Sequence, residues 1–188
     1  MILDATAGNR RFWRNYSDNI IYIDIQKKLE KKPTMFADNR KLPFQDKTFH
    51  TIIYDPPHTW DFSSIFFGFP DKESWIKNHP NDNRQYPTYY GMDIYKSKTS
   101  LISSIYKAQK ELSRVIVDDG VLWLNWSELT ISLNKIIVLF SEWDEYIRLR
   151  ITSQHQTLSN TNNWWVCFMK KNTQQSGKLK THDLETYM

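Results

Sequence analysis

Short apolar runs alternate with longer polar or amphipathic segments along most of the chain. Each run has the length of a β-strand and is bounded by charged residues, Gly, Pro or Asn, which commonly end strands. We therefore expect strands within seven segments, at residues 1–4, 19–26, 34–38, 48–57, 118–126, 145–152 and 163–171. The last two segments are expected to form a hairpin-like antiparallel pair.

Helical periodicity separates several of these runs. The apolar residues of 100–116 fall on one face of a helix, and they are Leu101, Ile105, Ala108 and Leu112. We expect further helices over 7–16, after a turn at Gly8, and over 127–143, with Ser127 as the N-cap. Strands interleaved with helices predict an α/β fold around a largely parallel sheet.

The length of 188 residues and the hydrophobic content of 40% suit a single domain with its own core. We expect this domain to span 1–171, with an aromatic and basic insertion at 59–97 and a loosely ordered polar tail at 172–188. Cys167 is the only cysteine, which argues against a disulfide framework and a cysteine-based metal cluster. The net charge of +4 is compatible with a phosphate-bearing partner.

Acidic residues end each of the first four predicted strands, and they are Asp4, Asp24, Asp38 and Asp55. Because α/β proteins bind ligands beyond the carboxyl ends of their strands, we expect these carboxylates to lie near one site. Gly8 allows a ligand to approach the first turn closely. Asp24 lies where an acid accepts hydrogen bonds from ribose hydroxyls, and Asp38 with Asn39 is placed to accept from an adenine amine. Together these residues predict an adenosine site.

Other interpretations stay open for each residue taken singly. Asp4 is also typical of a capped turn, and Asp24 of an exposed strand end. The dinucleotide fingerprint G-x-G-x-x-G is absent, because one glycine stands where that motif has three. Its absence argues against a nicotinamide-dependent dehydrogenase.

Four stretches resemble class I S-adenosylmethionine-dependent methyltransferases, and they are LDATAGNRRFW, IYIDIQ, MFADNRKLPFQDKTFHTIIYDPPH and DDGVLWLNWSE. DPPH resembles the [DNS]-P-P-[YFWH] motif of enzymes that methylate exocyclic amines of nucleic acid bases. The order of the motifs is similar to that of small methyltransferases of phages and mobile elements, over about residues 1–170. The resemblance implies a Rossmann-like, seven-stranded, mostly parallel sheet with helices on both faces and a terminal antiparallel strand pair.

The resemblance also implies S-adenosyl-L-methionine as the cofactor. The residues implied at its methionine end are Asp4, Ala5, Thr6 and Gly8. Those implied around its adenosine are Asp24 at the ribose, Ile25 on the adenine ring, and Asp38 and Asn39 at the adenine edge.

Two features depart from the family pattern. Arg10 stands where many members have a second glycine, so we expect either that its bulk points away from the cofactor or that the loop runs differently. The chain begins directly at the first predicted strand, whereas many members have a preceding helix. This predicts a more open site, or one closed by another part of the chain or by a partner subunit.

The tetrapeptide Asp55-Pro56-Pro57-His58 has a chemical rationale. An exocyclic amine is a poor nucleophile because its lone pair is delocalised into the ring. We expect Asp55 and the carbonyl of Pro56 to accept its two N–H groups and turn the lone pair toward the methyl donor. The prolines hold these acceptors rigid, and His58 offers a flat ring to the base. No metal is needed, because the cofactor supplies the electrophile.

A base inside a duplex must be flipped out before it can reach such a site. Aromatic and basic residues in and beyond the insertion are candidates to hold it. The substrate-binding candidates are Trp60, Phe62, Tyr89, Tyr90, Asn125 and Trp126. Each aromatic taken singly is also compatible with simple packing onto the sheet.

We therefore expect an amino-methyltransferase that acts on adenine N6 of DNA with little sequence recognition, because the chain has no room for a recognition domain of ordinary size. The alternatives are an RNA methyltransferase, acting on guanine N2 or adenine N6 of tRNA or rRNA, and a cofactor-binding scaffold that needs a partner. Expected partners are nucleic acid, DNA rather than RNA, and a second copy or a partner subunit. We expect no membrane contact and a cytoplasmic location, in the host cytoplasm if a phage or virus encodes the chain.

Overall fold

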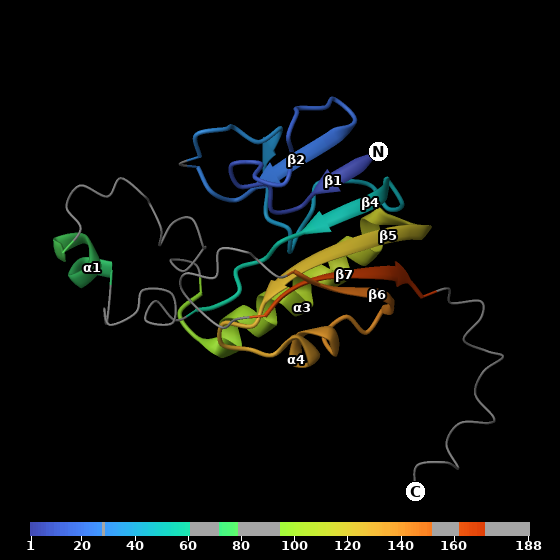
Figure 1. The fold of residues 1–188 in the computed structure, drawn as a ribbon. Coiled ribbons are helices and arrows are strands. Elements are labelled where there is room, and N and C mark those ends of the chain that lie inside the picture. The colour runs from blue at the N-terminus through green and yellow to red at the C-terminus, as the bar shows by residue number, and fades with distance from the viewer. Residues whose placement is uncertain (28, 61–71, 79–94, 152–161, 172–188) are drawn as a thin grey trace, which may run out of the picture.

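The computed structural model describes residues 1–27, 29–60, 72–78, 95–151 and 162–171 (Figure 1). Its helices are α1 (Lys72–Asn78), α3 (Lys98–Val115) and α4 (Leu133–Ile137). Its strands are β1 (Ile2–Asp4), β2 (Ile20–Asp24), β3 (Met35–Phe36), β4 (Phe49–Tyr54), β5 (Ile116–Ser127), β6 (Trp143–Ile151) and β7 (Asn163–Lys170). The expectations for Phe62, Tyr89, Tyr90 and the tail at 172–188 lie outside the described residues.

All seven strands form one sheet in the order β3-β2-β1-β4-β5-β7-β6. Pairing is parallel from β3 to β5, and β7 runs antiparallel to both of its neighbours. The predicted strands, the largely parallel sheet and the antiparallel pair are therefore confirmed. The strand order reverses between β1 and β4, and ligands of open α/β sheets bind beside such a switch point.

The helix predicted over 100–116 is confirmed as α3. Ser97 caps it, because the Ser97 hydroxyl accepts from the backbone N–H of Ser100 and the Ser100 hydroxyl accepts from that of Ser97. The predicted apolar stripe, with Leu101 and Leu112 near its ends, is fully buried against the sheet. The chain then passes directly from α3 into β5, so the fifth strand begins at Ile116, two residues before the predicted segment 118–126.

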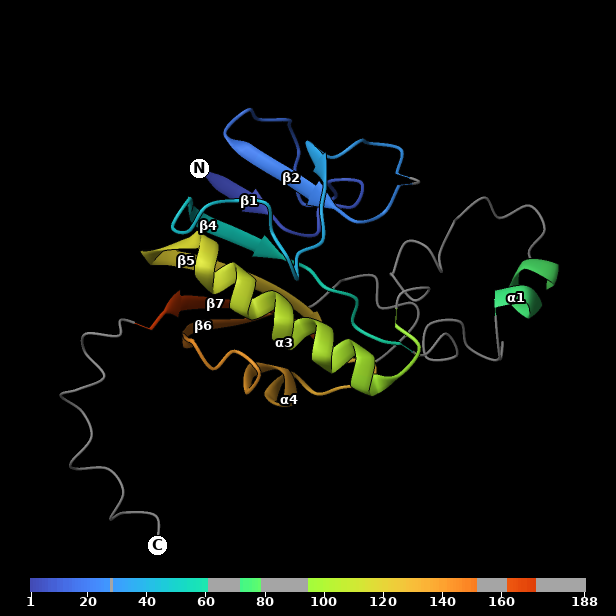
Figure 2. The ribbon, with the colours of Figure 1, turned by 180° about the vertical axis from the view of Figure 1, so that it is seen from behind.

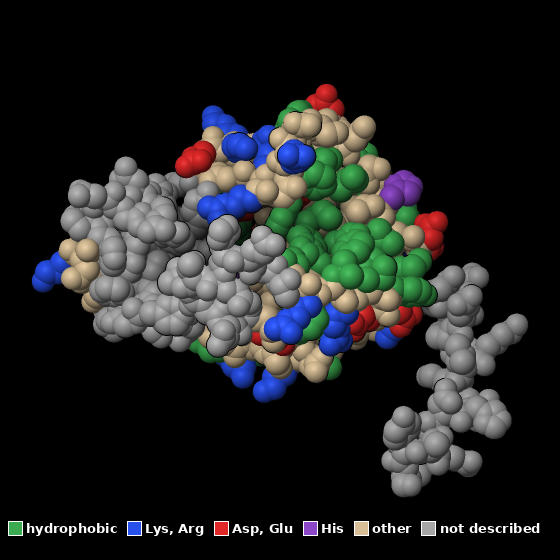
Figure 3. Space-filling view, viewed as in Figure 1, with side chains coloured by type: hydrophobic (Ala, Val, Ile, Leu, Met, Phe, Trp, Pro, Cys, Tyr) green, Lys and Arg blue, Asp and Glu red, His purple; other side chains and the backbone are tan. Residues whose placement is uncertain are grey.

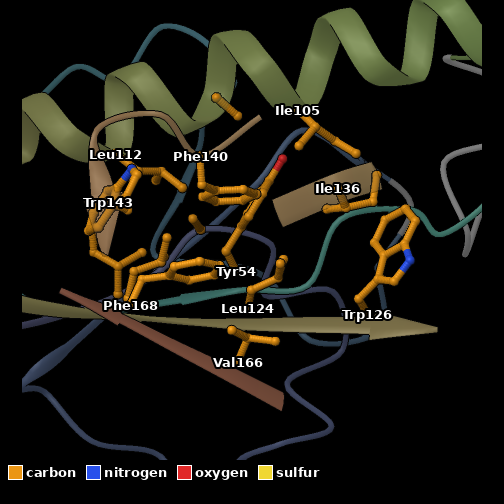
Figure 4. Packing of buried hydrophobic residues seen from close by; sticks show 14 of the residues in the cluster. Tyr54, Ile105, Leu112, Leu124, Trp126, Ile136, Phe140, Trp143, Val166 and Phe168 are labelled. Carbon is orange, nitrogen blue, oxygen red and sulfur yellow. The ribbon is translucent and has the colours of Figure 1, made fainter. Parts of the chain in front are cut away.

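The larger hydrophobic core of the described residues lies between α3 and one face of the sheet (Figure 4). Tyr54 of β4, Leu124 of β5 and Phe168 of β7 point toward α3 from the strands. Ile136 of α4 and Phe140 lie on the same side of the sheet as α3. Both α3 and α4 therefore cover one face, as Figure 2 shows from behind.

The helix predicted over 7–16 is wrong. This segment forms successive turns, in which the N–H of Arg10 donates to the carbonyl of Ala7 and that of Trp13 to the carbonyl of Arg10. Gly8 and Arg10 have φ angles of 48° and 57°, in the left-handed region that interrupts a right-handed helix. The turns therefore replace the first crossover helix.

The helix predicted over 127–143 is wrong except for the short α4. Ser127 is the last residue of β5 and not an N-cap. The Glu128 carboxylate accepts from the backbone N–H of Leu133, and the Trp126 indole donates to the carbonyl of Ile131, which holds the intervening chain in turns. Its apolar periodicity was real, since Leu133 lies in the core with residues 136, 140 and 143. Turns after α4 place Phe140 and Trp143 in the core.

Helices on both faces are not confirmed, because the described helices that pack on the sheet lie on one face. On the other face, residues 5–18 cover β1 and β2, where Trp13 packs against Tyr22. Among the described residues, no helix combines the length and apolar character needed to cross a membrane.

Candidate functional site

A pocket opens at the carboxyl ends of β1, β2, β3 and β4. Most of its lining comes from the loops that follow these strands: Ala5–Asn9 with Arg11 and Phe12, Asp24–Gln26, Ala37–Arg40 and Asp55–His58. Tyr95, which precedes α3, completes it and shares a hydrogen bond with the Ser104 hydroxyl. The predicted cofactor and catalytic residues are therefore brought to one pocket, with the exception of Asp4.

Asp24 is held at the end of β2 by two backbone donors. The N–H of Gly8 lies 2.8 Å from Oδ2 of Asp24, and the N–H of Gln26 lies 2.7 Å from Oδ1. Burial raises the pKa of Asp24, and these hydrogen bonds oppose that rise. Each carboxylate oxygen has further acceptor capacity. The pattern suits a ligand that donates a pair of neighbouring hydroxyl groups.

Asp38 and Asn39 line the pocket beyond β3. The Arg40 side chain donates to both carboxylate oxygens of Asp38, and this pairing lowers the pKa of Asp38. The Asn39 side-chain amide donates to the carbonyl of Ala5 and so joins the third loop to the first. Ile25, beside them, is 43% exposed and offers an apolar surface to a flat ligand ring.

Asp4 is buried and does not line the pocket, so the structure does not place it at the predicted methionine end. Its Oδ2 accepts from the Trp13 indole N–H at 2.7 Å, and its Oδ1 accepts from the N–H of Thr6 at 3.3 Å. Burial raises its pKa to about 6, and the nearby Asp55 and Asp24 charges add to the rise. Asp4 therefore stabilises the loop after β1, which lines the pocket, without lining the pocket itself.

Arg10 points away from the pocket, as the sequence predicts. Its guanidinium lies 4.6 Å from the ring centroid of Tyr22 and 5.1 Å from that of Tyr16, and it donates to the carbonyl of Lys32. Asn9 beside it accepts at its side-chain oxygen from the N–H groups of residues 30 and 31. These contacts fix the first loop against the chain that follows β2.

The DPPH tetrapeptide forms the wall of the pocket after β4. The N–H of Asp55 donates to the Thr6 hydroxyl at 2.7 Å, so this predicted cofactor residue also anchors the catalytic loop. Oδ1 of Asp55 lies 3.3 Å from Nε2 of His58. Within the described residues, Asp55 Oδ1 and His58 Nδ1 are buried without a hydrogen-bond partner. Buried polar atoms of this kind are expected to bond to a ligand.

Trp126 is fully buried, which corrects the prediction that it contacts substrate directly. Its indole packs edge-to-face with the His58 ring, with centroids 5.2 Å apart, and its N–H donates to the carbonyl of Ile131 at 2.9 Å. Trp126 therefore holds His58 from behind. Trp60 packs against the core, and neither Trp60 nor Asn125 lines the pocket.

Sequence reasoning missed several lining residues. Gln26, Ala37 and Arg40 neighbour the predicted acids, so their position beside those acids was a usable signal. Phe12 and Tyr95 gave no such signal in the sequence, because only the folded course of their loops brings them to the pocket. Among the described residues, no group of three His, Cys, Asp or Glu side chains is arranged to hold a metal ion.

No protein-family model matches the chain, and no curated protein matches it. Solved structures do resemble it. The [4+2]-cyclase SpnF is 11% identical with a TM-score of 0.53, over 90% of this chain and 74% of that chain. A SAM-dependent methyltransferase from Methanosarcina mazei is 13% identical with a TM-score of 0.49, over 90% of this chain and 91% of that chain.

A further solved structure, the PH0226 protein from Pyrococcus horikoshii, is 12% identical with a TM-score of 0.42. The match covers 73% of this chain and only 58% of that protein. At 11% identity the likeness to SpnF concerns the fold alone. The substrate and the activity therefore have to be inferred from the residues of the pocket.

Proposed function

We propose that the chain is an S-adenosyl-L-methionine-dependent methyltransferase that acts on an exocyclic amine of a nucleic acid base. The observation that carries the proposal is the buried Oδ1 of Asp55, which makes no hydrogen bond among the described residues although it lies 3.3 Å from Nε2 of His58, in the same pocket as Asp24. One acid is oriented for neighbouring hydroxyls, and the other is an acceptor in the opposite wall. A nucleoside-bearing donor and an amine acceptor would occupy these two parts.

The pocket residues fit the cofactor at its adenosine end. Asp24 would accept from the two ribose hydroxyls, because its carboxylate is already oriented by Gly8 and Gln26. Ile25 would lie against the adenine ring, with Asp38 and Asn39 at the ring edge. When bound, S-adenosyl-L-methionine supplies an electrophilic methyl group on a sulfonium.

Asp55 and the carbonyl of Pro56 would each accept one N–H of the target amine. This leaves the nitrogen lone pair directed at the methyl group, and the gain comes from orientation and from stabilising the positive charge that develops on nitrogen. Transfer of the methyl group to this nitrogen would leave the electron pair of the broken carbon–sulfur bond on sulfur, and the methylated amine would lose one proton to water. Trp126 holds the His58 ring at the pocket, where it would pack on the base.

The preferred target is adenine N6 of DNA. The DPPH tetrapeptide resembles the motif of enzymes that methylate exocyclic amines of nucleic acid bases. Guanine N2 or adenine N6 of tRNA or rRNA, and a scaffold role without catalysis, are the alternatives that the experiment separates.

The test incubates the full chain with isotopically labelled S-adenosyl-L-methionine and, separately, with unmodified DNA, tRNA and rRNA. Digestion to nucleosides then identifies the methylated base. We expect labelled N6-methyl-2′-deoxyadenosine from DNA, and label in tRNA or rRNA alone would reject the DNA assignment. Asp55→Ala should lower the rate by about 100-fold or more, whereas Asp119→Ala, an exposed change near the other end of β5, should leave it unchanged.

Calorimetry separates the cofactor from the chemistry. Asp24→Ala should weaken binding of S-adenosyl-L-methionine by about 10-fold or more, since it removes acceptors for two hydroxyls, and Asp55→Ala should leave binding nearly intact. Binding without methylation of any nucleic acid would favour the scaffold alternative. An Asp24→Ala variant that binds as the wild type does would contradict the ribose assignment.

A further inference from the structure

The face of the sheet opposite α3 is apolar across four strands. Paired residues on neighbouring strands share a face, and the register aligns Ile53 with Trp123 and Trp123 with Cys167 on this side. The side chains that form it, which we refer to as the open face, are Ile53, Val121, Trp123, Trp165, Met169, Ile147 and Leu149, with the buried Cys167 among them. Figure 3 shows a hydrophobic surface over β4, β5 and β7 on this side of the sheet.

The strands are apolar on both sides. Leu122, Leu124 and Val166 alternate with open-face residues and are fully buried under α3. Strands that are hydrophobic on both sides belong to sheets that are covered on both faces. Among the described residues, no helix packs on the open face, and Ile147 and Leu149 are 45% and 50% exposed there.

Phe12 connects the open face to the pocket. Its ring packs edge-on against Trp165, with centroids 5.0 Å apart, and it also lines the pocket. Phe12 is 44% exposed. Any molecule that covers the open face beside Trp165 would therefore also cover one wall of the pocket.

We propose that the open face is the interface of a homodimer, in which the open faces of two copies pack against each other and bury Phe12 of each. A twofold interface requires a surface that is complementary to itself. An apolar face meets this condition, because the same apolar side chains can pack against their copies in a second chain. In Figure 3 both acidic and basic side chains border the hydrophobic surface, so rim charges of opposite sign are available to meet across a twofold axis.

The size of the face agrees with this occupant. Ile147, Leu149 and Phe12 are 45%, 50% and 44% exposed, and the other open-face residues except Cys167 are partly exposed. At roughly 150–250 Å² for a large side chain, the face with Phe12 presents on the order of 500 Å² of apolar surface. A standard interface buries about 800 Å² per partner, of which roughly 60% is apolar. Two sheets packed face to face lie about 10 Å apart and form a core between them, as in a β-sandwich.

Dimer formation and pocket closure would be linked. If the second copy excludes water from Phe12, a ligand in the pocket binds the dimer more tightly than the monomer, and by reciprocity the ligand favours the dimer. This coupling rests on the proposed cofactor site. The proposal of the dimer interface does not depend on that site.

The test measures the mass of the full chain by sedimentation over a range of concentrations. We expect twice the 22.6 kDa of one chain, and Leu149→Arg should give the single mass, because it places a charge inside the interface but outside the pocket. Val138→Arg is the matched control, since Val138 is 73% exposed and follows α4, away from the open face. It should remain dimeric.

Ile147→Lys is a second variant on the same strand, and circular dichroism confirms that each variant is folded. Calorimetry on folded Leu149→Arg should show binding of S-adenosyl-L-methionine weakened by about 10-fold. A wild-type chain that stays monomeric at every concentration, or a dimer that survives both variants, overturns the proposal. A wild-type dimer that does not bind S-adenosyl-L-methionine refutes the cofactor site and leaves the interface standing.

Discussion

Asp4→Asn replaces the buried acid beside the pocket loop. We expect the stability of this variant, relative to that of the wild type, to increase as the pH rises. In the folded chain burial raises the pKa of Asp4 from 3.8 to about 6. Its protonated form is therefore the one that folding favours. The stability contributed by that proton is fully present below pH 4 and is lost as the pH rises through about 6.

The magnitude follows from the two pKa values. Each pKa unit corresponds to about 1.4 kcal/mol, so the shift of Asp4 is worth about 3 kcal/mol between the acidic and neutral limits. Asn has no charge to bury at any pH and still offers an oxygen to the Trp13 indole. Its amide faces the N–H of Thr6 less favourably, but that cost does not vary with pH.

The assay is urea unfolding of Asp4→Asn and the wild type between pH 4 and pH 8, followed by tryptophan fluorescence. The free energy of unfolding of Asp4→Asn minus that of the wild type should increase by about 2 to 3 kcal/mol from pH 4 to pH 8. A flat difference for Asp4→Asn, or one that falls with pH, would refute the assignment of a raised pKa.

Two further predictions concern the sheet and the adenine end of the pocket. Gly120→Ala should destabilise the fold by about 1 to 3 kcal/mol in the same unfolding assay. A Cβ at this position would lie 2.4 Å from Cγ1 of the buried Ile116 and 3.0 Å from the carbonyl oxygen of His50. A Gly120→Ala variant as stable as the wild type would contradict this prediction. Arg40→Gln should raise the pKa of Asp38, measured by carbon NMR of its carboxyl, because Arg40 is the main cause of its lowering; an unchanged value would show that other groups set it.

Local pattern was sufficient for the strands and for the arrangement of the acids. Asp24 and Asp55 follow apolar runs of strand length, and parallel pairing brings the ends of those runs together by geometry alone. The stripe from Leu101 to Leu112 predicted α3 because helical spacing and burial agree there. The same spacing from Leu133 onward predicted too long a helix, since turns place those side chains in the core equally well.

The sequence by itself determined the order of the elements, the carboxylates at the strand ends and the DPPH turn, because these depend on short-range periodicity and on residue type. Only the tertiary structure decided that residues 7–16 fold as turns, since the contacts of Arg10 with Tyr16 and Tyr22 hold its left-handed backbone. It also decided that Trp126 supports His58 from the core, and that one apolar face of the sheet has no described helix on it. Burial depends on what packs against a residue, and that information lies in segments distant along the chain.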